Sequence, residues 1–258
     1  MTVPIPFLQH KIDMTLYTIG FFTKIVRSTG HFIVRGQVAF KILIMQILFT
    51  CVEALGIIIL LAVGIGVAVM GIGMPFLAGF SQERYIYPLL ITIIMREAGP
   101  LLAAFIIAAR SATAIATEMA GMVISHEVEA YISVGIDPIE HLAVPRFLGV
   151  TISMMLLTCY FSLFGLGGSF LVTQLFNPMP GSVYFNNLLQ TLTLRDFFIS
   201  LLKSISFGMI ISMVAISQGF AVERASTEIP VAGLRAVSAA FTGCIVINIL
   251  LSALYYSL

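Results

Sequence analysis

Residues 96–146 read REAGPLLAAFIIAARSATAIATEMAGMVISHEVEAYISVGIDPIEHLAVPR. The stretch opens with a charged pair inside an apolar run and leaves that run at Arg110. It then becomes a polar, acidic segment that closes at Pro145-Arg146, where the next apolar run begins. A charged pair at membrane depth is thus followed, one helix later, by a loop that must lie in water. This order predicts a link between a site in lipid and a partner outside it.

The composition indicates a membrane protein. Of the 258 residues 59% are hydrophobic and only 10% are charged, and the mean hydropathy is +1.07. Soluble domains average about 25% charged residues, so the chain is expected to cross a membrane several times. The net charge of +1 excludes a broad electrostatic surface for nucleic acid.

The three cysteines, Cys51, Cys159 and Cys244, stand alone within or beside apolar runs. Their spacing matches no metal-binding pattern and no disulfide framework. We expect no metal site, and we expect the three thiols to be buried and unreactive.

Residues 1–41 combine basic side chains with apolar ones spaced three or four apart. This pattern is typical of a helix that lies in the membrane surface. The alternative is the amphipathic start of the first spanning helix. We therefore divide the chain into an N-terminal interfacial region, 1–41, and a transmembrane domain, 42–258.

Five apolar runs follow, each long enough for the roughly 20 residues that a spanning helix needs. They cover 42–74, 86–109, 147–176, 197–220 and 234–257. The expected fold class is an all-α membrane protein with five transmembrane helices. Small residues four apart, Gly64 with Ala68 and Ala239 with Gly243, predict close helix packing within the chain or across a dimer.

The basic residues give an orientation. With the N-terminus in the cytoplasm, nine of them lie in cytoplasmic segments, whereas the outer loops hold only Arg84 and Arg195. This bias follows the positive-inside rule and predicts an external C-terminus.

Arg96 and Glu97 lie near the middle of the second run. A charge there costs at least about 2.5 kcal/mol unless it is paired or faces water. One interpretation is a polar site in a central cavity, and the other is a structural ion pair with another helix. Pro100 has no N–H, so the carbonyl of Arg96 loses its intrahelical partner and the helix is expected to bend there.

Arg195, Asp196 and Lys203 flank or enter the fourth run from its outer side. Lys203 is about two turns from Arg195, so both side chains are able to face one side of a helix and hold a phosphate head group. For Lys203 alone, snorkelling of the ammonium to the interface is an equal alternative.

The segment 111–145 is too polar to insert. Ser111 to Ile132 has few helix breakers and predicts one or two helices that end at Gly135-Ile136-Asp137-Pro138. Its acidic residues suggest docking onto a cytosolic protein, although composition alone favours a merely solvated face.

Several short motifs resemble one known family. They are GPLLAA at 99–104, RSA at 110–112, EMAGM at 118–122, EVEA at 127–130, GIDP at 135–138 and PR at 145–146. Together they resemble the MlaE family, permeases of ABC transporters that work with MCE-domain proteins on lipids. The ordered match covers about fifty residues, and the helix arrangement agrees over nearly the whole chain.

The resemblance implies a homodimer in the inner membrane of a diderm bacterium that moves phospholipid between inner and outer membranes. A cytoplasmic ABC ATPase (MlaF-like), a small STAS-domain protein (MlaB-like) and a periplasmic MCE-domain hexamer (MlaD-like) would complete the assembly. The segment 111–145 would be the coupling segment, with contacts to the ATPase from Glu118, Met122, Glu127, Glu129, Asp137 and Pro138. The lipid path would run near Arg96, Glu97, Arg195, Asp196 and Lys203. The chain has no GxxxxGK[ST] motif, so no cofactor is expected on it and the partner would bind ATP.

Two other functions are alternatives. An intramembrane hydrolase or protease needs a nucleophile and base, or metal ligands, at membrane depth. The four histidines fall in interfacial or cytoplasmic segments, and neither HExxH nor GxSxG occurs, so no catalytic residue is expected. A passive scaffold or an ion-coupled carrier, with Glu97 as the proton-binding group, would act without an ATPase.

Overall fold

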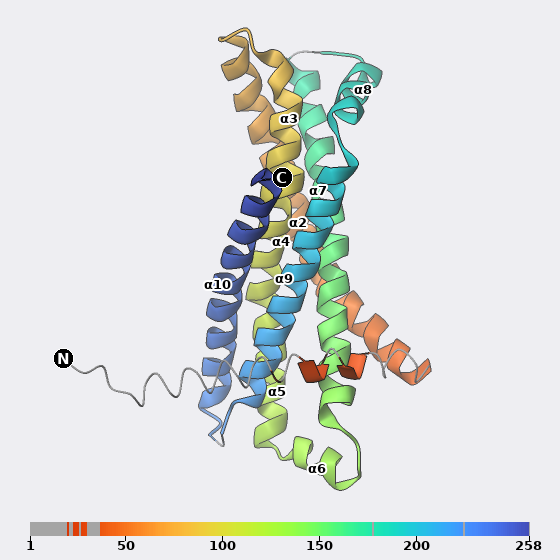
Figure 1. The fold of residues 1–258 in the computed structure, drawn as a ribbon, viewed down its shortest axis with the longest axis vertical. Helices are drawn as coiled ribbons and strands as arrows, with labels where there is room; N and C mark the ends of the chain where they lie inside the picture. Colours follow the sequence, from red (N-terminus) through yellow and green to blue (C-terminus); the bar gives the residue numbers. More distant parts are fainter. Residues whose placement is uncertain are drawn as a thin grey trace, which may run out of the picture.

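The computed structural model describes residues 20, 23–25, 27–29, 37–176, 178–223 and 225–257. Most of the predicted interfacial region, 1–41, lies outside these residues, so that prediction stays open. The described part is an elongated helical bundle (Figure 1). Its main helices are α2 (Gln37–Ala78), α3 (Ile86–Ile91), α4 (Gly99–Ile107), α5 (Thr113–Ile124), α6 (Glu127–Ser133), α7 (Val144–Phe176), α8 (Gly181–Thr191), α9 (Leu194–Phe220) and α10 (Glu228–Ser257).

Short segments of other helix types join them. A 3₁₀ turn, η1 (Glu83–Tyr85), precedes α3, and three π-helical segments interrupt the longer rods. These are η2 (Thr92–Ala98), η3 (Ala108–Ala112) and η4 (Ile139–Ala143). Such π turns commonly occur at functional sites.

The prediction of five spanning helices is confirmed. Five helices are long and apolar enough to cross a membrane, namely Lys41–Ala78, Glu83–Ile124, Ile139–Leu175, Leu194–Phe220 and Glu228–Ser257. The second does not end where its apolar run ends at Ala109, because no breaker follows and the helix runs on to Ile124. The polar residues 111–124 therefore extend the second span rather than form a separate loop.

The close contact between α2 and α7 depends on glycine. A Cβ on Gly66 would meet the carbonyl of Gly165 and would lie 3.0 Å from the amide nitrogen of Ser169. Gly64, by contrast, has no described neighbour within 4 Å of its Cβ position. The Gly64–Ala68 spacing thus identified a small-residue face whose Gly64 meets none of the described residues, because a four-residue repeat does not say which face turns inward.

The fifth span also packs through a glycine. A Cβ on Gly243 would lie 2.7 Å from Cγ2 of Ile210, so α10 approaches α9 at this point. Packing within the chain is therefore present at Gly243, whereas contacts across a dimer stay a prediction for both spans.

The helix α8 was not foreseen. It follows the third span at the end of the bundle that lies opposite α6 (Figure 1). Tyr184 anchors it, fully buried, with its hydroxyl 2.6 Å from Ser169 Oγ and donating to the carbonyl of Leu166 at 3.1 Å. Burial raises the pKa of Tyr184, so the phenol stays protonated.

One cysteine prediction was wrong. Cys244 is buried, but Cys159 lies exposed on α7 and Cys51 is intermediate. An apolar run in a membrane protein specifies depth in lipid and leaves undecided whether a residue faces the bundle or the acyl chains.

Candidate functional site: a charge cluster on a π turn

The charged pair of the second span lies on the π-helical segment η2. The amide of Gly99 bonds to the carbonyl of Ile94, five residues earlier, and a Cβ on Gly99 would collide with that same carbonyl. Pro100 follows and offers no N–H to the carbonyl of Arg96. The Gly-Pro pair therefore favours a wide turn and leaves the Arg96 carbonyl without its usual helical partner.

Lys203 of α9 fills that gap. Its ammonium donates to the Arg96 carbonyl at 2.9 Å, to Glu97 Oε2 at 2.8 Å and to Ser252 Oγ of α10 at 2.7 Å. Its side chain is only 1% exposed. All three ammonium protons are thus used, which is what a cation buried in an apolar bundle requires.

Glu97 is held from two helices. Besides Lys203, Ser252 lies 3.1 and 3.0 Å from its two carboxylate oxygens, and the amide of Asn248 lies at 3.5 Å. The side chain nevertheless remains 32% exposed, so one side of the carboxylate is accessible.

Arg96 points to a different residue of α9. Its guanidinium lies 3.2 Å from Asp196 Oδ1 and donates to the Tyr256 hydroxyl at 2.9 Å. The same group lies 4.5 Å from the centre of the Tyr255 ring, in cation–π geometry. Adjacent residues of a helix point in different directions, and here the two charges use two different counter-ions.

Asp196 is itself fixed by a capping box. Its Oδ2 accepts from the backbone amide of Thr193 at 3.0 Å and from the Thr193 hydroxyl at 2.7 Å, at the N-terminus of α9. The Tyr255 hydroxyl donates to Oδ1 at 3.1 Å. The carboxylate also lies where the helix dipole favours negative charge.

We call Arg96, Glu97, Asp196 and Lys203 the charge cluster. Asp196 and Lys203 are seven residues apart, so they lie on one face of α9, opposite the adjacent Arg96 and Glu97. Two positive and two negative groups alternate, and the cluster is neutral overall. Both ion pairs of the structural interpretation are present, while the accessible side of Glu97 keeps contact with lipid a prediction.

Arg195 stands apart from Lys203. It is exposed, lies 4.6 Å from the Tyr255 ring centre and donates to the Tyr255 carbonyl at 3.3 Å. Lys203 points into the bundle and does not snorkel. The two cations therefore do not form one ring, although Arg195 meets the cluster through Tyr255.

The predicted coupling segment folds as α5, a turn and α6. His126 adopts a left-handed conformation with φ of 61° between the two helices, and Gly135 follows α6 with φ of 81°. Glu118 on α5 pairs with Arg146 at the start of α7, 2.7 Å away. This ion pair ties the two ends of the segment together within the chain.

The remaining coupling candidates differ in exposure. Glu127 and Glu129 are exposed; the first accepts from Ser125 at 3.0 Å, and the second lies 2.9 Å from His126. Asp137 caps the amide of Ile139 at 2.9 Å, just before η4. Met122 and Pro138 are half-buried.

Sequence reasoning missed an apolar surface in the same segment. Ile132, Val134 and Ile136 are 60%, 76% and 41% exposed, and all three lie between the second and third spans. Exposed aliphatic side chains outside the spans are typical of a protein-binding patch. The sequence signal for this surface is the alternation of the three aliphatic residues in an otherwise polar segment.

Comparison with known proteins decides the family. The family model described as Permease MlaE matches residues 43–254. The chain belongs to the MlaE permease family. The match covers the second, third and fourth spans in full, nearly all of the first and fifth, and the whole charge cluster.

Several curated relatives of this MlaE-family chain are similar over different lengths. A probable ABC transporter permease of Rickettsia typhi is 33% identical over 55% of this chain and 54% of its own length. The probable permease of Rickettsia prowazekii is 26% identical over 82% of each chain. The intermembrane phospholipid transport system permease protein MlaE of Haemophilus influenzae is 24% identical over 84% of each chain.

Proposed function

We propose that this chain is the permease subunit of an ABC transporter that moves phospholipids between two membranes and takes its energy from a separate ATPase. Membership of the MlaE family supports the proposal, as do the printed names of the relatives from Rickettsia and Haemophilus. The single observation on the molecule that carries it is the charge cluster, where a partly accessible carboxylate lies deep in a spanning helix.

The cluster suits a passage for a molecule with a polar head. Each charge has an internal counter-ion, so the bundle is stable when empty. A lipid head group that reaches Glu97 or Arg96 would take the place of the internal counter-ion. The head group would then cross the hydrocarbon layer without meeting an unpaired charge. Arg195, on the outer side, would add a guanidinium able to bind phosphate through two parallel hydrogen bonds.

The assembly that we propose has further parts. Two copies of the chain would form the permease in the inner membrane, with the N-terminus cytoplasmic and the C-terminus periplasmic. The ATPase would dock on the segment 111–145, where the apolar patch of Ile132, Val134 and Ile136 offers the contact area. A STAS-domain protein would bind the ATPase, and an MCE-domain hexamer would stand on the periplasmic side.

Reconstitution tests the transport role. The full chain, reconstituted with its co-isolated ATPase and its periplasmic partner, should move labelled phospholipid only when nucleotide is hydrolysed. Glu97→Ala and Arg96→Ala should each lower the rate at least about tenfold, the effect of losing a charge-assisted contact. The neighbouring exposed pair offers matched controls, Glu83→Ala and Arg84→Ala, which should keep the wild-type rate.

Unchanged transport in both cluster variants would remove the cluster from the mechanism. Transport that persists without ATPase and nucleotide would instead support the ion-coupled or passive carrier. Failure of the chain to co-purify with any ATPase would overturn the ABC assignment.

A further inference from the structure

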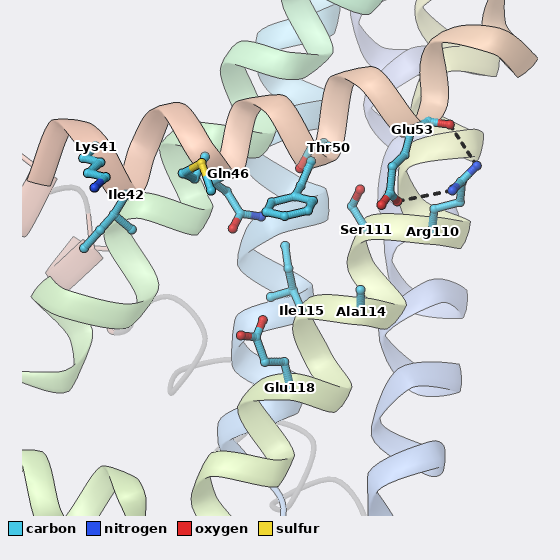
Figure 2. A pocket seen from close by; sticks show the side chains of 12 residues that line it. Lys41, Ile42, Gln46, Thr50, Glu53, Arg110, Ser111, Ala114, Ile115 and Glu118 are labelled. Carbon is cyan, nitrogen blue, oxygen red and sulfur yellow. Dashed lines mark hydrogen bonds and ion pairs between the residues drawn. The ribbon is translucent and has the colours of Figure 1, made fainter.

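A second polar feature lies at the other end of the second span. A cavity of about 520 Å³ opens between α2 and the η3–α5 segment (Figure 2). In Figure 2 α2 runs across the view and α5 runs downward below it, so the cavity lies in the angle between the two helices. None of the four residues of the charge cluster lines it.

The cavity lies away from the cluster, toward the end of the second span that leads to Ile124. Ser111, on its wall, is fifteen residues beyond Arg96 along the same span, a distance of roughly 22 Å at 1.5 Å per residue. Lys41, also on the wall, is the first residue of the first candidate span, and Glu118 is close to the end of the second. The cavity therefore straddles the edge of the hydrocarbon layer.

Its polar lining has unused hydrogen-bonding capacity. Thr50 is only 5% exposed, lines the cavity, and makes no side-chain hydrogen bond with any described residue. Lys41 is exposed and forms no ion pair within the described part of the chain. Both groups therefore keep protons that a ligand in the cavity is able to accept.

The charged groups around these donors have both signs. Arg110 is fixed against Glu53, with contacts of 3.0 Å to its carbonyl and 3.2 Å to its Oε2, and Figure 2 shows the pair at one end of the cavity. Glu118 lies on the opposite side, on α5. Both carboxylates already have internal partners, Arg110 for Glu53 and Arg146 for Glu118, whereas Lys41 has none among the described residues, so the phosphate of a ligand near Lys41 would be matched in charge.

The rest of the lining is apolar. Ile42, Met45 and Phe49 of α2 face Ile115 of α5 across the cavity, and Phe49 is 61% exposed. A ligand with a charged head and a hydrocarbon body therefore fits this wall better than a soluble phosphate does. At the edge of a bilayer the available molecule of that kind is a phospholipid.

We propose that this cavity binds the head group and upper acyl chain of a phospholipid from the leaflet at the Lys41 end of α2. The site is separate from the charge cluster. The inference goes beyond the proposed function and needs no transport. A binding result therefore leaves the ATPase-driven role untouched, whichever way it falls.

A photoreactive side chain identifies the occupant. The full chain carrying Phe49→benzoylphenylalanine, in nanodiscs of phosphatidylethanolamine and phosphatidylglycerol, is irradiated and analysed by mass spectrometry. We expect an adduct of phospholipid mass on the peptide that contains residue 49. An adduct with the chain's own residues 1–36, with a second copy or with another protein would overturn the proposal.

Variants distinguish a specific lipid site from the boundary lipid that coats every apolar face. In the same background, Thr50→Val with Lys41→Gln should lower the adduct yield about fivefold, since one basic residue near a lipid surface contributes about 1 kcal/mol. The control changes the same residue types elsewhere, Thr242→Val on α10 and Lys24→Gln, and should keep the yield. Equal yields in the two double variants would show ordinary boundary lipid and refute the site.

Discussion

Replacing Lys203 by methionine tests how the charge cluster supports the fold. Methionine has a similar length and no donor, so the change removes the ammonium while keeping most of the packing. Three acceptors then lose the ammonium as a donor, namely the Glu97 carboxylate, which keeps Ser252 and Asn248, the Ser252 hydroxyl, and the Arg96 carbonyl that Pro100 has already deprived of its helical partner.

The magnitude follows from burial. Removing one partner of a buried ion pair costs about 3–5 kcal/mol. Lys203 is 1% exposed but Glu97 is 32% exposed, so the remaining carboxylate recovers part of its solvation. We therefore expect Lys203→Met to lower the free energy of unfolding by about 3 kcal/mol, at the lower end of that range.

The double variant Glu97→Gln with Lys203→Met removes both charges and keeps an amide for Ser252 to bond. Because no uncompensated charge remains, we expect it to recover at least half of the lost stability. The difference between the double variant and the two single ones gives the coupling energy of the pair.

Unfolding of the purified chain by sodium dodecyl sulfate, in one mild detergent, measures these differences. Lys24→Met is the matched control, since Lys24 is 57% exposed and lies 3.8 Å from Asp137. Such an exposed pair contributes at most about 1 kcal/mol. A loss for Lys203→Met no larger than that of the control, or a double variant less stable than Lys203→Met, would refute the assigned role of the ion pair.

Two further predictions concern packing. Gly208→Ala places a Cβ 2.6 Å from the backbone of α7 and should lower stability by about 1–3 kcal/mol, whereas Gly167→Ala meets no described atom within 4 Å and should not destabilise the protein in the same unfolding assay. In a Cys51→Ser background, maleimide should label the exposed Cys159 in detergent within minutes but reach the buried Cys244 only on unfolding; equal labelling rates by mass spectrometry would contradict the placement of α7 and α10.

The sequence by itself determined the number of spans, because each spanning helix must satisfy its own backbone hydrogen bonds in lipid and so leaves a long apolar run. It also indicated the family, since the motifs between Gly99 and Arg146 occur in order within one stretch. The released carbonyl of Arg96 followed from the chemistry of Pro100 alone.

Only the tertiary structure decided the partners of the charges and the faces of the helices. Nothing local to Arg96 names Asp196, a hundred residues away, as its counter-ion, and periodicity did not reveal that Lys203 turns inward. The same reason explains why Gly66 rather than Gly64 packs against α7, and why Cys159 is exposed. In lipid both faces of a helix are apolar, so the hydrophobic pattern that orients a soluble helix is absent, and orientation is set by which neighbours pack.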